Sequence, residues 1–290
     1  MIEKIIEILN NADNILILTH IRPDGDTLGS AYGLKYALEG KNVKVFCPEL
    51  PKERLMFLYE EDDKTFDPQL IIAVDAAELS LLGEINYPID IKIDHHPNGS
   101  SYAKLNYIDP EASSCGEMIF KICTHMGKIN RKISEYLYAA ICYDTGNFRY
   151  RNVTAETHRI AAELIDTGID SAEIGNRLFG LKTQSELEVI RLAYDNLHYY
   201  NNGKIAVINI NADGDINAIP LDIQGVEIGI TIRPDEPCKF RISMRSVEGI
   251  DVSAICARLG GGGHVKAAGA IIEADDPETA ERIVMEALYG

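Results

Sequence analysis

The chain has 290 residues, of which 46% are hydrophobic and 25% are charged, so it is long enough for two domains that each bury a core. Its 28 basic and 45 acidic residues give a net charge of −17. Such a surface repels long nucleic acids, because non-specific binding to a polyanion needs many Lys and Arg contacts to phosphate. A long duplex is therefore excluded as a partner, and an anionic substrate must be attracted locally, by bound metal or a few arginines.

Six cysteines show no C-x-x-C pair and mostly lie in apolar segments, which predicts free thiols in a reducing compartment. The first residues lack the basic and apolar regions of a signal peptide. No apolar run approaches the roughly 20 residues that a membrane-spanning helix needs. We therefore expect a cytoplasmic protein with no membrane contact.

The first part of the chain alternates predicted helices and strands. Apolar residues at helical spacing predict a helix over residues 2–10, and a β-branched run predicts a strand over 15–19. This order is typical of an α/β domain with a parallel sheet. The further elements expected in this half are strands at 43–47, 70–75 and 89–94 and helices at 27–38, 54–59, 115–126, 131–142 and 156–167.

The most informative stretch follows the strand at 15–19. The strand ends at His20, and Asp24 and Asp26 come next in a turn that contains Pro23 and Gly25. A loop can fold one imidazole and two carboxylates toward neighbouring points, and these donors suit Mn²⁺, Mg²⁺, Zn²⁺ or Fe²⁺ better than soft metals. Taken alone, the same residues could be ordinary turn residues, since Pro-Asp-Gly is itself a turn signal.

Three further apolar segments end in potential metal ligands. The run at 70–74 ends at Asp75, the run at 89–93 precedes Asp94-His95-His96, and the segment at 139–143 ends at Asp144. Functional groups gather at the carboxyl ends of the strands of an open parallel sheet. The coincidence of four such segments favours a shared metal site over four unrelated strand ends.

Other polar residues in this half have simpler interpretations. Ser114 and Glu117 have capping-box spacing, and the helix that begins there could also offer free N–H groups to a phosphate oxygen. Both interpretations stay open. We expect His125, His158 and His198 to be structural or exposed, because each lies in a helical pattern with no acidic or histidine partner at ligand spacing.

The second part of the chain predicts a separate, smaller α/β domain. An amphipathic, charged helix over 180–200 is the best candidate for a connector between domains. We therefore expect a catalytic domain at 1–180, a helical linker at 181–200 and a second domain at 201–290. Within the second domain we expect strands at 204–210, 226–233 and 238–245 and helices at 251–259 and 277–288.

Two features of the second domain predict an anion site. The strand at 239–246 has a period of two, which places Arg241, Ser243 and Arg245 on one face, and guanidinium groups pair bidentately with phosphate. Alternatively, these three residues could simply form a solvent-exposed strand face that binds no anion. The second feature is a glycine run followed by a histidine, whose backbone N–H groups could turn toward an anion, although a flexible linker is again an alternative. Its residues are Gly261, Gly262, Gly263 and His264.

Together these motifs resemble the DHH phosphoesterase superfamily, whose name-giving motif is Asp94-His95-His96 here and whose associated C-terminal domain is typified by the glycine-histidine motif. The match covers essentially the whole chain and looks like the oligoribonuclease and phosphoadenosine-phosphate phosphatase branch. The resemblance implies a two-domain α/β fold with an N-terminal parallel sheet, helices on both of its faces, a smaller C-terminal α/β domain and an active site in the interdomain cleft.

Carried over position by position, the resemblance implies two divalent metal ions, for which the imidazole ligands favour Mn²⁺ over Mg²⁺. It implies that His20, Asp24 and Asp75 hold the first metal, and that Asp75 is shared with the second. The ligands implied for the second metal are Asp26, Asp75, His95 and Asp144.

The remaining motif residues receive roles beside the metals. His96 is expected to stabilise the charge of the transition state or protonate the leaving oxygen, and Asp94 to orient its neighbours. The residues expected to bind the far phosphate of the substrate are Arg241, Ser243, Arg245, Gly261, Gly262, Gly263 and His264.

The resemblance therefore implies a phosphodiesterase or phosphatase that acts on very short oligoribonucleotides, from dinucleotides to about pentanucleotides, or on adenosine 3′,5′-bisphosphate, with linear di-adenylate among the substrates. A cyclic-dinucleotide phosphodiesterase and an inorganic pyrophosphatase or exopolyphosphatase are the alternatives. A nucleotide-sensing module is disfavoured because no metal ligand is missing. A homodimer is a possible assembly.

Overall fold

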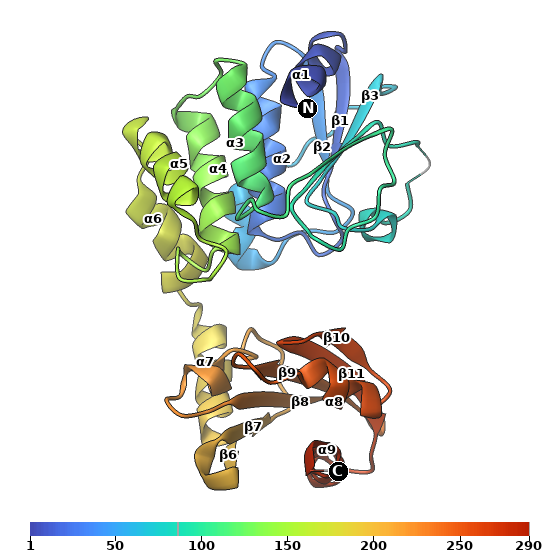
Figure 1. Cartoon of the computed structure of the whole chain (residues 1–290), viewed down its shortest axis with the longest axis vertical. Helices are drawn as coiled ribbons and strands as arrows, with labels where there is room; N and C mark the ends of the chain where they lie inside the picture. The colour runs from blue at the N-terminus through green and yellow to red at the C-terminus, as the bar shows by residue number, and fades with distance from the viewer. Residues whose placement is uncertain (86, 290) are drawn as a thin grey trace. The chain divides into compact units, whose positions relative to one another are not determined.

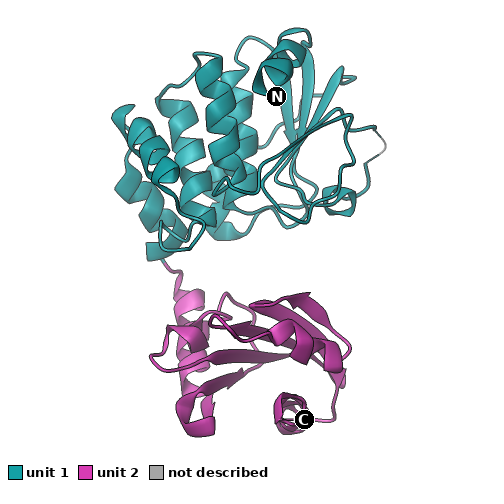
Figure 2. Cartoon of the chain, in the orientation of Figure 1, with its two compact units in different colours: residues 1–181 teal, residues 182–290 magenta. Residues whose placement is uncertain are grey.

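The computed structural model describes residues 1–85 and 87–289. The chain divides into two compact units, residues 1–181 and residues 182–290 (Figure 2). Each unit has its own sheet and its own buried core. No helix in the described ranges is long and apolar enough to cross a membrane.

Unit 1 is built on a parallel sheet, as predicted, and the sheet has five strands: the four predicted ones and β5, which was not predicted from the sequence. The strand order is β2-β1-β3-β4-β5, so the three strands that precede the candidate ligands are neighbours. Every side chain of β3 is buried, as its uninterrupted apolar sequence predicts for a central strand. The strands are β1 (Asn14–Leu18), β2 (Asn42–Phe46), β3 (Leu70–Val74), β4 (Ile91–Asp94) and β5 (Leu105–Ile108).

The α-helices of unit 1 form one large core with the sheet. Helices α2, α3 and α4 lie side by side (Figure 1), and their apolar side chains pack in the same cluster as those of Ile15, Ile72 and Ile93. The helices are α1 (Ile2–Asn10), α2 (Gly25–Ala37), α3 (Cys115–His125), α4 (Arg131–Asp144), α5 (Ala155–Asp166) and α6 (Ser171–Gly175), with shorter turns at η1 (Glu53–Leu58), η2 (Leu79–Leu82) and η3 (Asn176–Gly180).

The α2–α4 contact depends on a close approach of the two backbones. A Cβ atom at Gly29 would lie 2.4 Å from the carbonyl oxygen of Tyr136 and 2.8 Å from Cβ of Ala140. Only glycine fits at this position.

The opposite face of the sheet differs in detail from the expectation of helices on both faces. Its buried side chains, such as Ile71 and Ala73, pack against η2 and the loops that follow β3 and β4, with Leu82 and Tyr102 among their partners. The parallel α/β class is confirmed, but loops and a 3₁₀ turn cover this second face.

Unit 2 has a six-stranded mixed sheet in the order β10-β11-β9-β8-β7-β6. Helices α8 and α9 pack with one of its faces, around Ile230, Ile242 and Val284. The strands are β6 (Leu197–Tyr200), β7 (Ile205–Asn209), β8 (Ile228–Glu236), β9 (Lys239–Ser246), β10 (Gly262–His264) and β11 (Ala267–Glu273), and the helices are α7 (Gln184–Asp195), α8 (Val252–Arg258) and α9 (Pro277–Tyr289), with turns at η4 (Asn201–Gly203) and η5 (Ile219–Asp222).

The segment expected to be a helical linker, 181–200, carries helix α7 and then strand β6. Ala193 of α7 is fully buried against Ile208 and Ile216, so the helix packs within unit 2. Strand β6 pairs antiparallel with β7. The amphipathic pattern that suggested a connector is thus the contact of this helix with its own domain.

Candidate metal centre

Neighbouring strands of unit 1 deliver most of the predicted ligands to one edge of the sheet. His20 lies just beyond β1, Asp75 directly follows β3, and His95 directly follows β4. Asp144 is different, because it is the last residue of helix α4 and not the end of a strand. Of the four apolar segments that were expected to meet at this edge, three are therefore strands and the fourth is a helix.

The turn after β1 places two carboxylates in different directions. Asp24 is the N-cap of α2, and one of its oxygens accepts the N–H groups of Asp26 at 2.9 Å and Thr27 at 3.1 Å. The helix therefore begins at Gly25, two residues earlier than predicted. Asp26 lies in the first turn and is fully buried, so its carboxylate points into the protein.

The first ligand group consists of His20, Asp24 and Asp75. Nε2 of His20 lies 3.7 Å from Oδ1 of Asp24 and 3.7 Å from Oδ2 of Asp75. One donor atom from each of the three residues lies within 4.8 Å of the others, a spacing that could hold a metal ion.

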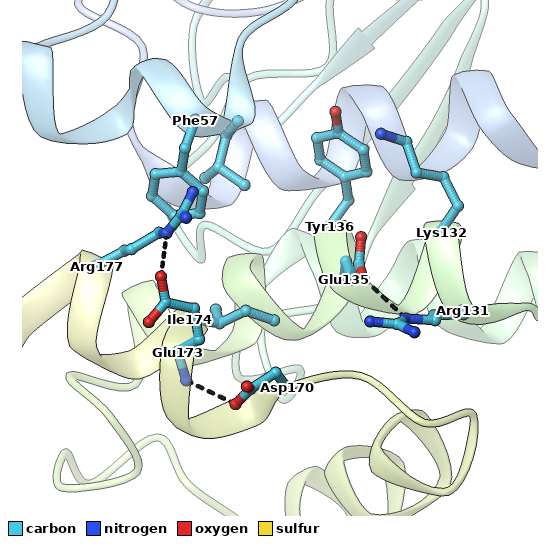
Figure 3. Close-up of a pocket in the computed structure, with 10 residues that line it drawn as sticks. Phe57, Arg131, Lys132, Glu135, Tyr136, Asp170, Glu173, Ile174 and Arg177 are labelled. Carbon is cyan, nitrogen blue, oxygen red and sulfur yellow. Dashed lines mark hydrogen bonds and ion pairs between the residues drawn. The ribbon is translucent and has the colours of Figure 1, made fainter.

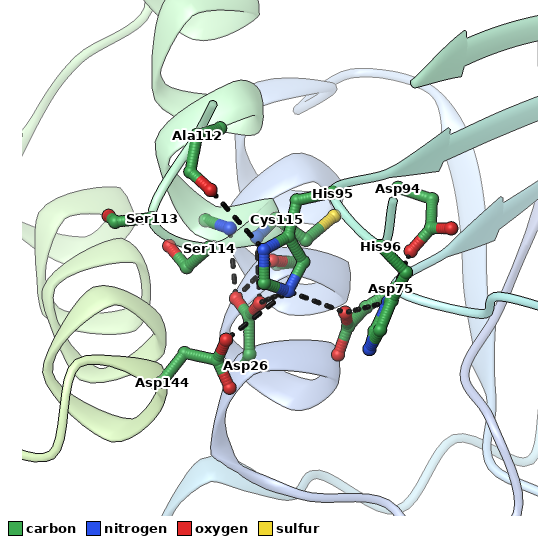
Figure 4. A network of polar contacts seen from close by, with 12 residues as sticks. Asp26, Asp75, Asp94, His95, His96, Ala112, Ser113, Ser114, Cys115 and Asp144 are labelled. Atoms are coloured by element: carbon green, nitrogen blue, oxygen red, sulfur yellow. Dashed lines mark hydrogen bonds and ion pairs between the residues drawn. The ribbon is translucent and has the colours of Figure 1, made fainter. Parts of the chain in front are cut away.

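The second ligand group consists of Asp26, His95 and Asp144. Nε2 of His95 lies 3.7 Å from Oδ2 of Asp26 and 3.2 Å from Oδ2 of Asp144. It also lies 3.6 Å from Oδ1 of Asp75 (Figure 4). Because Oδ2 of Asp75 faces His20, the two oxygens of Asp75 face different groups. The structure thus brings all six predicted ligands together, with Asp75 between the two sets.

Both imidazoles are oriented for ligation through Nε2. Nδ1 of His20 lies 2.7 Å from the carbonyl oxygen of Ile21, and Nδ1 of His95 lies 3.3 Å from that of Ala112. Because a carbonyl oxygen only accepts, Nδ1 carries the hydrogen in each ring, and the lone pair of the neutral ring is on Nε2. Such outer contacts typically fix metal-binding histidines.

Asp26 is held by the amino terminus of helix α3. Its carboxylate accepts the backbone N–H groups of Cys115 at 2.7 Å and Gly116 at 2.9 Å, and the hydroxyl of Ser30 at 3.1 Å. A Cβ at position 116 would lie 2.5 Å from Cβ of Ala140, so glycine permits this approach. The N–H groups that the sequence offered to a phosphate are therefore used by a buried carboxylate of the centre.

The capping interpretation of the start of α3 is half confirmed. Ser114 accepts the backbone N–H of Glu117 at 3.1 Å, as predicted. The carboxylate of Glu117 does not return to the N-cap but accepts the backbone N–H and hydroxyl of Ser113 and the hydroxyl of Thr157. Glu117 thus joins α3 to the start of α5.

His96 has a different environment from the other two histidines. Its Nδ1 lies 2.7 Å from Oδ1 of Asp94 and 3.8 Å from Oδ1 of Asp75, and its side chain is 45% exposed. Because Nδ1 faces Asp94, the outward Nε2 is the ring atom left for another partner. Asp94, in contrast, is fully buried at the end of β4.

The pKa values of the cluster show that its buried carboxylates favour bound positive charge. Burial, and then the neighbouring carboxylates, raise the pKa of Asp75 to about 6 and the pKa of Asp26 well above its usual value. Burial opposes the charged form of the histidines, but Asp24 and Asp75 raise the pKa of His20 to about 11, and Asp144 with its neighbours raises the pKa of His95 to about 10. The metal-free cluster therefore retains protons where cations would otherwise balance the carboxylates.

Asp75 carries two further signs of a metal ligand. Its Oδ1 is buried without a hydrogen-bond partner, which is costly for a carboxylate unless a cation satisfies it. Its backbone has a φ of 55°, an unfavourable conformation for a residue with a Cβ. Imidazole and carboxylate donors together suit a divalent metal, so the residues present fit such an ion.

In unit 2, the strand register aligns several of the predicted anion-binding residues. Arg245 of β9 pairs with Ala267 of β11, which pairs with His264 of β10. Ser243 lies in the next row, opposite Gly269 and Gly262. Cross-strand pairs point to the same face, and the alternate residues of β9 are in the core, so these polar residues lie on the face away from the core formed with α8 and α9.

Arg241 shares the face of Arg245 but is already paired. Its guanidinium forms an ion pair with Asp235, and its side chain is 62% exposed. Nη1 of Arg245 donates to the carbonyl oxygen of Met244 at 2.9 Å, and no carboxylate pairs with it among the described residues. Arg245 is therefore the better placed of the two to bind an anion.

The glycine run is less free than its sequence suggested. Gly262–His264 is a β-strand that pairs with β11. A Cβ at Gly261 would lie 2.1 Å from the carbonyl oxygen of Gly269, and Gly263 has a φ of 144°. The glycines thus permit a close edge strand and not a mobile linker.

Unit 1 has a pocket of about 280 Å³ that is lined by other residues than the predicted ligands (Figure 3). Its cations are satisfied locally, since Arg177 pairs with Glu173 at 2.7 Å and Arg131 with Glu135 at 3.2 Å. The pocket includes none of the residues predicted for catalysis or metal binding.

Sequence reasoning missed two side chains, one that contacts a ligand of the centre and one that lies beside the centre. Ser30 follows Asp26 by one helical turn, and this spacing was a usable signal for its hydrogen bond. Lys92 is buried and lies 3.0 Å from Asp94 through Nζ. Its signal was the alternation Ile-Lys-Ile-Asp, which places Lys92 and Asp94 on the same side of β4.

Comparisons with known proteins agree with this architecture. Residues 14–141 match the model of the DHH family, N-terminal domain, and residues 161–288 match the model of the DHHA1 domain. The bifunctional oligoribonuclease and PAP phosphatase NrnA of Bacillus subtilis is 31% identical over 98% of this chain and 96% of its own. The protein of the same name from Thermus thermophilus is 30% identical over 94% and 89% of the two chains.

A solved structure has the same fold over almost the full length. The exopolyphosphatase-related protein from Bacteroides fragilis superposes with a TM-score of 0.89, with 26% identity over 99% of this chain and 95% of that chain. The motif Asp94-His95-His96, the two matched domains and the full-length similarity lead to one conclusion: the chain belongs to the DHH family of phosphoesterases.

Proposed function

We propose that the protein is a metal-dependent phosphoesterase that hydrolyses very short oligoribonucleotides, from dinucleotides to about pentanucleotides, and adenosine 3′,5′-bisphosphate, with linear di-adenylate among its substrates. The observation that carries the proposal is the cluster of histidine and aspartate side chains around Asp75. The six proposed ligands form two of its groups, and a third group of Asp75, His95 and His96 brings His96 to the same place. The names of the relatives from B. subtilis and T. thermophilus support this substrate class.

We propose that two divalent ions, most readily Mn²⁺, occupy the centre. His20, Asp24 and Asp75 would hold one, and the set implied by the family would hold the other, namely Asp26, Asp75, His95 and Asp144. Four carboxylates at −4 would balance two cations at +4. When bound, such a pair supplies a water of lowered pKa and neutralises the phosphoryl oxygens.

The side chains around the centre have separate tasks in this proposal. The N–H groups of Cys115 and Gly116 hold Asp26 in one orientation, so it need not reorganise during the reaction. His96, half-exposed and oriented by Asp94, would place Nε2 near the reacting phosphate, to stabilise its charge or protonate the leaving oxygen. Asp94 thereby acts through His96.

We propose that unit 2 selects the substrate. The aligned Arg245 and His264 would bind a phosphate or sugar oxygen of the nucleotide that is not being cleaved, with Ser243 and the glycines Gly261, Gly262 and Gly263 permitting close approach. Arg241 would add positive charge to the same face, although its pairing with Asp235 weakens its contribution. An enzyme that binds one end of its substrate and cleaves the other end favours short oligonucleotides.

A hydrolysis panel tests the proposal. Purified protein with Mn²⁺ would be given labelled RNA chains of two to five nucleotides, adenosine 3′,5′-bisphosphate, linear and cyclic di-adenylate, and pyrophosphate. We expect turnover of the short RNA, linear di-adenylate and the bisphosphate, with rates falling as the RNA lengthens.

The same panel distinguishes the alternatives. Preferential cleavage of cyclic di-adenylate would indicate a cyclic-dinucleotide phosphodiesterase. Fast pyrophosphate cleavage with indifference to nucleotides would contradict both the proposed substrate class and the role given to Arg245 and His264. Binding without any turnover would reduce the chain to a nucleotide sensor.

A further inference from the structure

Lys92 is a buried cation beside the candidate metal centre that has no role in the chemistry proposed so far. It lies in the middle of β4 and its side chain is 0% exposed. Its neighbours Ile91 and Ile93 belong to the core shared with the helices, so Lys92 and Asp94 point to the opposite side of the sheet. A buried ammonium group is costly unless its charge is paired, so its contacts identify its role.

The ammonium group of Lys92 joins two segments that carry residues of the centre. Nζ donates to the carbonyl oxygens of Ala77 at 2.8 Å and Ser100 at 2.9 Å. Ala77 follows Asp75 by two residues, and Ser100 follows His96 by four. Lys92 therefore ties the loop after β3 to the loop after β4.

The same ammonium group pairs with the carboxylate that orients His96. Nζ lies 3.0 Å from Oδ2 of Asp94, while Oδ1 of Asp94 lies 2.7 Å from Nδ1 of His96. Figure 4 shows Asp94 and His96 facing each other at the end of the strand. Lys92, Asp94 and His96 are thus linked in sequence by an ion pair to Oδ2 of Asp94 and a hydrogen bond to Oδ1, and the ring of Tyr102 lies 4.8 Å from Nζ.

The loop after β4 leaves no spare space around this chain. A Cβ at Gly99 would lie 2.7 Å from Nζ of Lys92, 2.8 Å from Oδ2 of Asp94 and 3.1 Å from the carbonyl oxygen of Ala77. The backbone of residue 99 therefore closes directly over the Lys92–Asp94 pair. A displacement of Lys92 or Asp94 should therefore also displace the backbone of the loop that follows His96.

We propose that Lys92 is a positioning residue for His96, which it holds toward the reacting phosphate by fixing the second oxygen of Asp94 and the backbone of residues 97–100. This inference rests on the proposed function, in which His96 acts on that phosphate. Lys92 contacts none of the six candidate ligands by an ion pair in the described part of the chain, so its loss should spare metal binding. A purely structural lysine would instead affect stability alone.

The test replaces Lys92 by methionine, which has a similar length and no charge. With the substrate that the wild type cleaves fastest, we expect K92M to lower kcat by about 10–100-fold, as for residues that orient a catalytic group, with KM changed less than about twofold. Titration calorimetry should give the same Mn²⁺ affinity and stoichiometry as for the wild type.

A second readout does not depend on activity. In the Mg²⁺-loaded protein, histidine-labelled NMR should show the Nδ1–H proton of His96 protected by its contact with Asp94, and this signal should be lost in K92M. The matched control is K104M, because Lys104 also pairs with an aspartate, Asp90, at 2.7 Å but is 69% exposed. K104M should keep wild-type kcat and the His96 signal.

A double-mutant cycle tests whether Lys92 acts through Asp94. If it does, K92M should lower kcat much less in the D94N background than in the wild type. If K92M does not fold, G99A tests the positioning role with the lysine retained. The added Cβ would force Lys92 and Asp94 apart. G99A should then lower kcat with little change in KM.

Three outcomes would overturn the positioning role: a kcat of K92M within twofold of the wild type, equal losses of kcat and Mn²⁺ affinity, or fully multiplicative effects of K92M and D94N. The proposed function fails separately, if the wild type hydrolyses none of the nucleotides. The NMR experiment still decides in that case, since a His96 signal that persists in K92M would show that Lys92 does not position the ring.

Discussion

Oδ1 of Asp75 lies 3.6 Å from Nε2 of His95, and its other oxygen lies 3.7 Å from Nε2 of His20, so one carboxylate faces both groups of candidate ligands. Asp75 also has the strained backbone and the unsatisfied buried oxygen. Among the predicted ligands, it is the residue shared by both of the proposed metal positions.

We therefore expect D75N to lose activity with every substrate. The amide keeps the shape of the side chain but removes the charge and one acceptor oxygen. The loss of kcat should exceed the roughly 10–100-fold effect of residues that only orient a ligand. Calorimetry should show fewer than two Mn²⁺ ions bound per chain.

D166N is the matched control for this prediction, because Asp166 is an exposed residue at the end of α5, far in sequence from the centre. It should behave as the wild type. Near-normal turnover by D75N would contradict the two-metal assignment.

The pH dependence of stability should differ between metal-free and metal-loaded protein. The pKa values of His20 and His95 in the metal-free fold, about 11 and 10, lie above the 6.5 of an unfolded chain. The stabilisation from these charged imidazoles is complete below pH 6.5 and is lost as the pH rises toward 10–11. Deprotonation of Asp75 above its pKa of about 6 adds repulsion in the same direction.

Metal binding requires neutral imidazoles, so it competes with protons and strengthens as the pH rises. The increase in Tm on adding Mn²⁺ to chelator-treated protein should therefore be larger at pH 9 than at pH 6. We expect a change of several degrees, since about 1 kcal/mol moves Tm by roughly 2–4 °C in a domain of this size. If the increase in Tm were the same at pH 6 and pH 9, metal binding by these residues would be contradicted. The same holds if H20A left the increase in Tm unaltered.

Much of unit 1 could be predicted from the sequence because its strands are continuous apolar runs that end in polar residues. The run before Asp75 identified a central strand, and the ends of three neighbouring strands placed the ligands together. Asp144 was grouped with these ligands because an apolar segment ends there and by the family resemblance, although it comes from a helix.

The remaining features depend on contacts between distant segments, which periodicity does not encode. The N–H groups that hold Asp26 come from Cys115 and Gly116, about 90 residues further along the chain. Alternation places Lys92 on the same side of β4 as Asp94, a signal that was not used in the prediction from sequence, and only the loop that closes at Gly99 buries the lysine there. The glycine run before His264 became an edge strand because β11 was available to pair with it.

The close packing of α2 on α4 gives a stability prediction. G29A would place a Cβ 2.4 Å from a backbone oxygen of α4, so the two helices must move apart. We expect a loss of about 1–3 kcal/mol, which outweighs the gain of up to about 1 kcal/mol from helix propensity. Because α2 carries Asp26 and α4 carries Asp144, Mn²⁺ affinity should fall as well. Thermal unfolding and calorimetry measure the two effects.

Gly175 supplies the control for this substitution. It lies in helix α6, where the nearest atom to an added Cβ is Oδ1 of Asn147 at 3.7 Å, an ordinary contact distance. G175A should therefore be neutral or slightly stabilising. Equal effects of G29A and G175A on Tm would show that the α2–α4 approach does not determine stability.

The last prediction concerns the difference between two arginines on the same strand of unit 2. Arg245 has no carboxylate partner among the described residues and aligns with His264, whereas Arg241 is paired with Asp235. R245A should therefore raise KM for a dinucleotide by about 10-fold or more, as expected when a charge-assisted contact to phosphate is lost. R241A should raise it less, because its guanidinium is already engaged.

A generic aryl phosphate ester separates substrate binding from chemistry, since it has no second nucleotide for Arg245 to contact. With this ester, R245A should keep kcat and KM near the wild-type values. If R245A raised KM equally for the dinucleotide and the ester, its effect would lie in the fold or the metal centre. Selection of short nucleotides by unit 2 would then have to be assigned to other residues of its exposed sheet face.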